Sequence, residues 1–584
     1  MKKHDLSKWN FSEQLDCLLF FGQRVTEILF DYTLASFKFP TLYSTSLCKE
    51  AIRTIKMIEN NELSKKSIIP IKEELTNRIY KDIVVREILG DMLSNYLKEF
   101  DIDNLTTYRT NLELLYNKIR PDIYINYTEK LLSKLIKENR KKEKINSLAT
   151  NYITALIDFG YSQSYINLQA NVFFFKRGDL PKIESPEVID EFFKLFPLKE
   201  GKYDLIISAS QLFKNIENAL HDFNIFIHNE RDNNLNKKEK QYFKNKGKDE
   251  LLLKFNGIEA LDALAAKEIA EIKLNTLSKL FTFFHHKEFP HFSKYALIYK
   301  DDKFQQAISP KTSAMQKGPD FYPNKAGEKL NTLIHNFGFE RESFFKMDKA
   351  IELHGESIKS DSSESQLLQN WIAFETLLVG YSDKSKIEQV LEGIIPALKL
   401  TYLSTLLKEL TSDLKYWNEK KTKEFLEPLT GEMLIEKVAQ MICFENNKPI
   451  REKFYENLET FPLLKNRILK LKENLSTPKD ALNLLLEHER RVIWQIKRIY
   501  RTRNQIVHLG YVPKYTSYLV ENSHNYLDIF IKQIIHLVIQ NLQIQSLEQG
   551  LKEIKINQKK HEILLEKNKE SEYTEKNYKV LLFG

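Results

Sequence analysis

Long stretches of this chain repeat apolar residues every three or four positions, and this period constrains the fold more than any other feature. It is clear in 12–34 and 71–100, and it returns in five segments between 330 and 542. Apolar residues at that spacing lie on one face of an α-helix, which can pack against a core. The 584 residues include only 17 Gly and 16 Pro, too few for a turn-rich β-sandwich or barrel. The sequence therefore predicts a mostly α-helical protein.

Changes in this pattern divide the chain into four predicted parts. Residues 1–155 are expected to form a helical N-terminal domain, because prolines separate its amphipathic segments. Residues 156–325 are expected to form a small α/β middle domain. There, β-prone runs at 171–176, 203–210 and 295–300 accompany a long helix at about 260–286, and polar insertions at 229–250 and 311–329 look like exposed loops. Residues 326–548 are expected to form a helical bundle. Residues 549–584 form a charged tail, expected either to project as a helix or to be partly disordered.

Charge and cysteine content narrow the cellular setting without fixing the function. The formal net charge of +8 permits a nucleic-acid partner but does not require one. Cys17, Cys48 and Cys443 share no metal-ligand spacing, and we expect them to be reduced, buried thiols. We find no signal peptide and no run near the roughly 20 apolar residues that span a membrane. The sequence therefore predicts a cytoplasmic protein without a membrane partner.

Several familiar catalytic and cofactor motifs do not occur in the chain. It has no phosphate loop ending in Lys-Ser/Thr, no GxGxxG, no HExxH, no paired CxxC and no GxSxG. The cluster HHKEFPH holds His285, His286 and His291, which could ligate a metal. Because adjacent histidines before Pro290 are typical of a helix end and its loop, we favour a structural role. We therefore predict no metal and no cofactor.

Arginine is concentrated in one short region, although lysine is the usual cation of this chain. Five of its 17 arginines, including Arg498, Arg501 and Arg503, fall between 490 and 503. A guanidinium is planar and always charged, and it can hold a phosphate with two hydrogen bonds. On a helix, Asn504 and His508 lie about 40° apart, and Arg501, seven residues before His508, returns to nearly the same face. Gly510 is placed to end this helix. The pattern favours anion recognition, although a solvated basic face would look similar.

The stretch RNQIVH resembles the Arg-x4–6-His signature of HEPN domains in its RNxxxH form. Its surroundings are most similar to the HEPN domain of ApeA-like proteins. Residues 349–378, with Trp371 and Glu375 in a Trp-x-x-x-Glu pattern, resemble the family's first helices. Residues 496–510 resemble its catalytic helix, and 524–539 its closing helix. The resemblance covers about 326–548.

This resemblance implies a helical bundle that forms a homodimer, with two motifs in one composite cleft, and a metal-independent endoribonuclease. Such proteins act in anti-phage defence by abortive infection or as toxins, so an RNA substrate and an unknown phage-derived trigger are the implied partners. His508 would assist proton transfer, Arg503 would stabilise charge on the phosphate, and Asn504 would orient these groups. Attack by the 2′-OH would restrict cleavage to RNA.

The resemblance also implies supporting residues and leaves one choice open. Glu375 would help to position the catalytic arginine. Arg498 and Arg501 would bind RNA. Because Arg501 also stands at an Arg-x6-His spacing, either Arg501 or Arg503 could be the main catalytic arginine.

Two other functions remain open at this stage. The chain could be a non-catalytic module that binds RNA or nucleotides through the same basic face and regulates a partner. It could also be a helical scaffold whose cationic helix meets an acidic protein. Salt-sensitive RNA binding without cleavage products would indicate the first of these alternatives.

Overall fold

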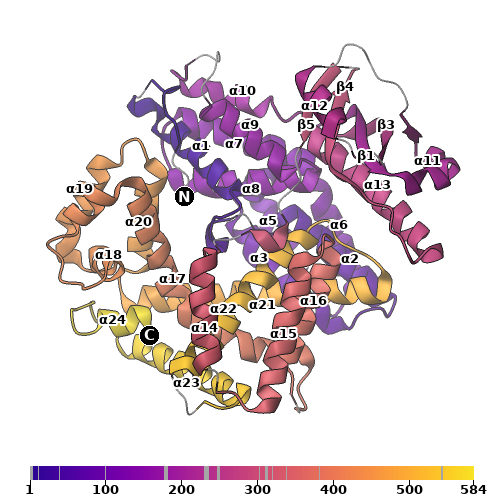
Figure 1. Cartoon of the computed structure of the whole chain (residues 1–584). Helices are drawn as coiled ribbons and strands as arrows, with labels where there is room; N and C mark the ends of the chain where they lie inside the picture. The colour runs from indigo at the N-terminus through magenta and orange to yellow at the C-terminus, as the bar shows by residue number, and fades with distance from the viewer. Residues whose placement is uncertain are drawn as a thin grey trace.

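The computed structural model describes residues 4–584 except for 11, 39, 99, 177–181, 229–235, 246, 248–249, 302, 309–312, 318–319, 337, 381 and 541–543. Helices dominate, and one small sheet lies in the middle of the sequence (Figure 1). This confirms the predicted fold class, a mostly α protein with a small α/β middle region. The buried apolar side chains form three clusters, here called the first, second and sheet cores.

The first core begins with ten helices from the N-terminal third of the chain. They are α1 (Asp16–Leu29), α2 (Ser44–Glu59), α3 (Ile69–Lys81), α4 (Ile83–Leu89), α5 (Leu93–Lys98), α6 (Leu105–Lys118), α7 (Pro121–Lys137), α8 (Lys142–Phe159), α9 (Gln163–Phe174) and α10 (Ile189–Phe193). Pro121 occupies the first turn of α7, where its missing N–H costs no hydrogen bond. Asp82 separates α3 from α4 and caps α4 by accepting hydrogen bonds from the N–H groups of Val84 and Val85. We call these ten helices the N-terminal body.

Later segments of the chain complete the first core. They are the second half of α17 (Lys386–Phe425), α18 (Leu434–Cys443), α19 (Lys448–Asn457), α20 (Pro462–Asn474), the start of α21 (Pro478–Leu509), and α24 (Tyr578–Phe583). The tail is therefore folded, because Leu565, Tyr578 and Leu582 are buried in this core. This corrects the expectation of a projecting or partly disordered tail.

The sheet core belongs to five antiparallel strands in the order β2-β3-β1-β4-β5. They are β1 (Gly201–Ser210), β2 (Ile225–Ile227), β3 (Glu250–Ala260), β4 (Phe292–Lys300) and β5 (Lys303–Ile308), accompanied by the helices α11 (Glu217–Asp222), α12 (Lys237–Asn245) and α13 (Ala263–Phe284). A run of small and apolar residues on α13, from Ala263 to Leu277, is buried against the sheet. Asp262 caps α13 and also accepts hydrogen bonds from the N–H and hydroxyl of Ser162, which ties the sheet to the N-terminal body.

The second core contains part of the range that the sequence analysis assigned to a bundle, 326–548, together with the start of the next helix. Its helices are α15 (Arg341–Lys359), α16 (Ser363–Leu378), the first half of α17, the second half of α21, α22 (Thr516–Gln540) and the first half of α23 (Leu547–Lys567), and α14 (Pro323–Asn336) lies against α22. Because α17 and α21 each begin in one core and end in the other, they join the two helical bodies (Figure 1). The three cores thus cut across the predicted domain ranges.

Local predictions for the middle region have mixed outcomes. Strands β1 and β4 and the long helix α13 are confirmed. The predicted strand at 171–176 is wrong, because Phe173 and Phe174 end α9 and pack against Phe192. Strands β3 and β5 were not predicted. The polar insertion at 229–250, expected to be a loop, contains α12. Residues 229–235 of this insertion lie outside the described part of the chain.

One described helix could cross a membrane by length and composition, whereas the sequence analysis found no such stretch. This helix is α17, and 61% of its most apolar window is buried inside the molecule. A core helix of this kind passes the same test. The absence of a membrane partner therefore stays a prediction.

Candidate functional site

Helix α21 carries the RNxxxH motif in its last two turns, and its sequence defines both of its ends. At the start, Thr477 and Asp480 form a reciprocal capping box, and Pro478 follows the cap. At the end, Gly510 adopts a left-handed conformation with φ 63°, which glycine adopts without strain. His508 therefore lies in the final turn, as the sequence predicted.

Two arginines of α21 are buried against the N-terminal body. The Arg498 side chain donates hydrogen bonds to Glu50 of α2, at 3.1–3.3 Å, and to Glu74 of α3, at 2.5 Å. Arg501 also forms an ion pair with Glu50. Arg498 is 1% exposed and Arg501 6%, so neither guanidinium is accessible to RNA in this structure. Their role here is to hold α21 against α2 and α3.

The electrostatics of this cluster favour the charged forms of Glu50 and Arg498. Burial alone would raise the pKa of Glu50, but Arg498 and Arg501 outweigh burial and lower it from 4.5 to about 2. Burial would lower the pKa of Arg498, but the carboxylates of Glu50 and Glu74 raise it above its usual value. Glu50 and Arg498 therefore both remain ionised at neutral pH.

Asn504 and His508 line one small surface hollow of about 300 Å³. Tyr500, Gln505 and Leu509 line it from the same helix. The opposite wall comes from the last turn of α2, with Met57, and from the segment between α2 and α3, with Glu62, Leu63, Ser64 and Ser67. His508 is exposed and Asn504 half-buried. The sequence analysis identified Asn504 and His508 together but missed the opposite wall, because nothing in the local pattern around Ser64 suggests a site.

Arg503 is the motif arginine that keeps its charge available. Its Nη1 donates a hydrogen bond to Asn504 Oδ1 at 3.1 Å, and within the described residues it contacts no carboxylate. Its side chain is half-buried and does not line the hollow. Between the two candidate arginines, Arg501 is neutralised by Glu50, whereas Arg503 could contact an anion beside Asn504.

Glu375 lies on α16 and reaches the site only through other residues. It accepts a hydrogen bond from Trp371 Nε1 at 2.7 Å and pairs with Lys386 at 3.2 Å. The Trp371 ring packs against Tyr500, with ring centroids 5.1 Å apart. Arg503 is not a partner of Glu375. Glu375 thus holds Trp371 against a residue of the hollow rather than positioning an arginine directly.

The end of α21 also exposes apolar side chains next to His508. Val507 is 48% exposed and Leu509 43%, and Tyr511 and Val512 follow in the loop. Ile506 is 5% exposed and belongs to the second core, whereas Val507, one residue later, lies outside it. We call Val507, Leu509, Tyr511 and Val512 together the apolar end beside His508.

Only one group of potential metal ligands converges in the described part of the chain. His354 of α15 and His524 and Asp528 of α22 bring ligand atoms within 4.8 Å of one another. A hydrogen-bonded arrangement also explains this group, since His354 Nε2 lies 3.0 Å from His524 Nδ1 and 3.2 Å from Asp528 Oδ1. Lys532 also pairs with Asp528 at 2.7 Å. This group lies elsewhere than His285, His286 and His291.

Comparisons of the chain with protein-family models, with curated proteins and with solved structures find no match.

Proposed function

We propose that this protein is a metal-independent endoribonuclease of the HEPN type, with Arg503, Asn504 and His508 as its catalytic residues. His508 would assist proton transfer between the attacking 2′-OH and the leaving 5′-oxygen. Arg503 would stabilise the negative charge that develops on the phosphate, and Asn504 would orient Arg503. The reaction needs no redox or metal chemistry, and its products would be a 2′,3′-cyclic phosphate and a 5′-OH end.

One arrangement carries this proposal: Asn504 and His508 share one surface hollow, and Arg503, free of any carboxylate among the described residues, is hydrogen-bonded to Asn504. A phosphodiester beside Asn504 could contact both an unopposed cation and an exposed imidazole. The buried cluster of Arg498, Arg501 and Glu50 supports this by fixing the helix. Arg503 is accordingly proposed as the main catalytic arginine, with Arg501 and Arg498 in positioning roles.

The proposed active form is a homodimer in which two motifs face each other. The apolar end beside His508 supports it, because exposed apolar residues next to a charged site are typical of an interface. A second copy seated there would also exclude water from the hollow, which strengthens the electrostatic contribution of Arg503.

The proposed role is anti-phage defence by abortive infection or toxicity, in the cytoplasm, after a phage-derived trigger. The test is expression in a bacterial host challenged with a panel of phages, comparing wild type with His508→Ala. The matched control is His536→Ala, an exposed histidine on α22 away from the hollow. We expect growth arrest and RNA fragmentation with wild type and His536→Ala, and neither with His508→Ala. Equal RNA integrity in all three strains under every challenge would reject the proposal.

A second candidate is a non-catalytic module that binds RNA or nucleotides and regulates a partner. The burial of Arg498 and Arg501 favours it, since it leaves the motif with fewer accessible cations than the sequence implied. It predicts RNA binding that weakens with salt and with Arg503→Ala, without any cleavage product.

A further inference from the structure

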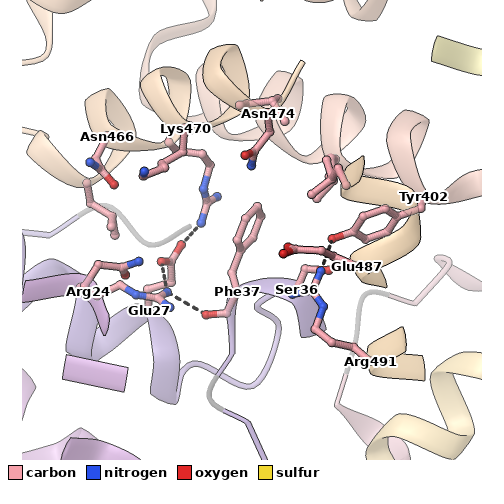
Figure 2. A pocket seen from close by; sticks show the side chains of 16 residues that line it. Arg24, Glu27, Ser36, Phe37, Tyr402, Asn466, Lys470, Asn474, Glu487 and Arg491 are labelled. Carbon is pink, nitrogen blue, oxygen red and sulfur yellow. Dashed lines mark hydrogen bonds and ion pairs between the residues drawn. The ribbon is translucent and has the colours of Figure 1, made fainter. Parts of the chain in front are cut away.

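A cavity lies between the N-terminal body and the helices α17 and α21, away from the RNxxxH motif. It consists of two adjoining hollows of about 280 and 410 Å³. They share five lining residues, which are Arg24, Ser36, Asn146, Tyr402 and Arg491. Figure 2 shows the smaller hollow, with Tyr402 and Arg491 on one side and Lys470 and Asn466 across from them. We call the two together the interdomain cavity. Its volume is in the range that small-molecule sites occupy.

Cations outnumber acids in the larger hollow. Its lining holds Arg24, Lys38, Arg78 and Arg491 against a single carboxylate, Glu74. Glu74 is already paired with Arg498 outside the hollow. The lining therefore carries a net positive charge, which favours an anionic ligand.

Two of these arginines have no carboxylate partner in the described chain. Arg24 pairs with Glu27, and Lys38 pairs with Glu521. Arg491 donates a hydrogen bond to the Tyr402 hydroxyl at 3.2 Å and forms no ion pair, and Arg78 forms neither. Elsewhere in this protein, buried arginines such as Arg498 and Arg467 are matched with carboxylates. Arg78 and Arg491 line the same hollow, and guanidiniums without an ion-pair partner can hold a phosphate through paired N–H donors.

The rest of the lining offers unused hydrogen-bonding groups. Asn151 is 5% exposed, and its side-chain amide makes no hydrogen bond with the described residues. The side-chain amides of Asn146, Asn522 and Asn525 are likewise unpaired in the described structure. Asn151 is buried and the other three asparagines are half-buried, and each amide can both donate and accept hydrogen bonds with a polar ligand in the hollow.

An aromatic pair adjoins Arg491. Tyr402 stacks on His488 with ring centroids 3.7 Å apart and planes at 5°. Burial first, and then the charges of Arg491 and Lys399, lower the pKa of His488 to about 3, so this imidazole is neutral at pH 7. The pair therefore fixes the Tyr402 hydroxyl beside Arg491 without adding a charge.

We propose that the interdomain cavity binds a small phosphate ester, with the phosphate on Arg78 and Arg491 and the polar body of the ligand on the asparagine amides. A nucleotide and a sugar phosphate both have this chemistry. This proposal does not depend on the proposed nuclease function, because it concerns different residues and is tested by binding alone.

The test measures binding of AMP and of ribose 5-phosphate to the full-length protein by calorimetry, with a thermal shift as a second readout. Adenosine, ribose and inorganic phosphate serve as reference probes. The variants are Arg78→Ala, Arg491→Ala and Arg491→Lys. Arg490→Ala is the matched control, since Arg490 is the neighbouring residue on α21 but lines a different hollow and pairs with Glu73.

We expect at least one of the two esters to bind and to raise the melting temperature, and to bind at least tenfold more tightly than its phosphate-free counterpart. Arg78→Ala and Arg491→Ala should weaken this binding tenfold or more. Arg491→Lys should recover part of it, and Arg490→Ala should match wild type. A circular dichroism melt of each variant separates lost binding from lost folding.

Three results would overturn the proposal. The first is that neither ester binds, which would leave a solvated cavity. The second is that inorganic phosphate binds as tightly as the esters, which would indicate an unspecific anion site. The third is that folded Arg78→Ala and Arg491→Ala bind like wild type.

Discussion

The buried cluster that holds α21 predicts a large effect for a single neutral substitution, Glu50→Gln. The side chain keeps its shape, but Arg501 loses its only carboxylate and Arg498 retains Glu74 alone. A pKa lowered from 4.5 to about 2 corresponds to about 3 kcal/mol of stabilisation of the charged form. Breaking a buried ion pair from one side costs a similar amount, about 3–5 kcal/mol, because the remaining charges stay desolvated.

Glu73→Gln is the matched control. Glu73 lies next to Glu74 on α3, is half exposed and pairs with the exposed Arg490 at 3.7 Å. Exposed pairs of this kind contribute about 0–1 kcal/mol. Urea denaturation followed by circular dichroism should therefore show a clear drop in midpoint for Glu50→Gln and almost none for Glu73→Gln.

The pH dependence gives this prediction a sign. Because folding lowers the pKa of Glu50, its contribution to stability is fully present above about pH 4.5 and is lost as the pH falls toward 2. The difference in unfolding free energy between wild type and Glu50→Gln should shrink over that window. The reasoning is refuted if Glu50→Gln has the same urea midpoint as Glu73→Gln at pH 7. It is also refuted if the difference in unfolding free energy between wild type and Glu50→Gln does not depend on pH.

Three further predictions concern the hollow beside His508. Arg503→Ala should lower RNA cleavage by about 100-fold without shifting the urea midpoint, since its charge stabilises only the transition state, whereas Arg501→Ala should lower both cleavage and the urea midpoint. Equal losses of midpoint in the two variants would contradict this division of roles. Leu509→Asp should reduce the dimer fraction measured by sedimentation velocity, because the proposed homodimer interface would bury a carboxylate. An unchanged dimer fraction would show that the interface lies elsewhere. Glu62→Gln should raise RNA affinity about two- to fivefold at low salt, because it removes a negative charge from the hollow. Unchanged RNA affinity in filter binding would show that RNA does not approach the wall of the hollow that holds Glu62.

The helical architecture was predictable because the apolar period is local. In α16, α21 and α22 the spacing of the apolar residues indicates which face is buried, and Gly510 indicates where α21 ends. The wrong strand prediction at 171–176 has a physical cause, because a short run of aromatic residues is compatible with a strand and with a fully buried helix end. The helical state of Phe174 depends on its packing against Phe192, which belongs to a separate helix, α10.

The site was predictable only as far as one helix reaches. Asn504 and His508 stand four residues apart, so the sequence alone brings them together. A cluster of arginines, however, looks the same whether it faces a phosphate or a buried carboxylate. Glu50 and Glu74 decide the role of Arg498, and they lie more than 400 residues earlier in the chain. Tertiary partners at that distance leave no local pattern.

The most direct test of the central claim is RNA cleavage by the purified protein in EDTA. The substrates are a labelled RNA and the same RNA with a single 2′-deoxynucleotide at the mapped cleavage position, and the enzymes are wild type and His508→Ala. We expect wild type to cut the all-ribose substrate in EDTA, leaving a 2′,3′-cyclic phosphate. It should spare the position lacking the 2′-OH, and His508→Ala should cut neither substrate. Cleavage that needs a divalent metal, that proceeds at the deoxy position, or that persists in His508→Ala would contradict the account.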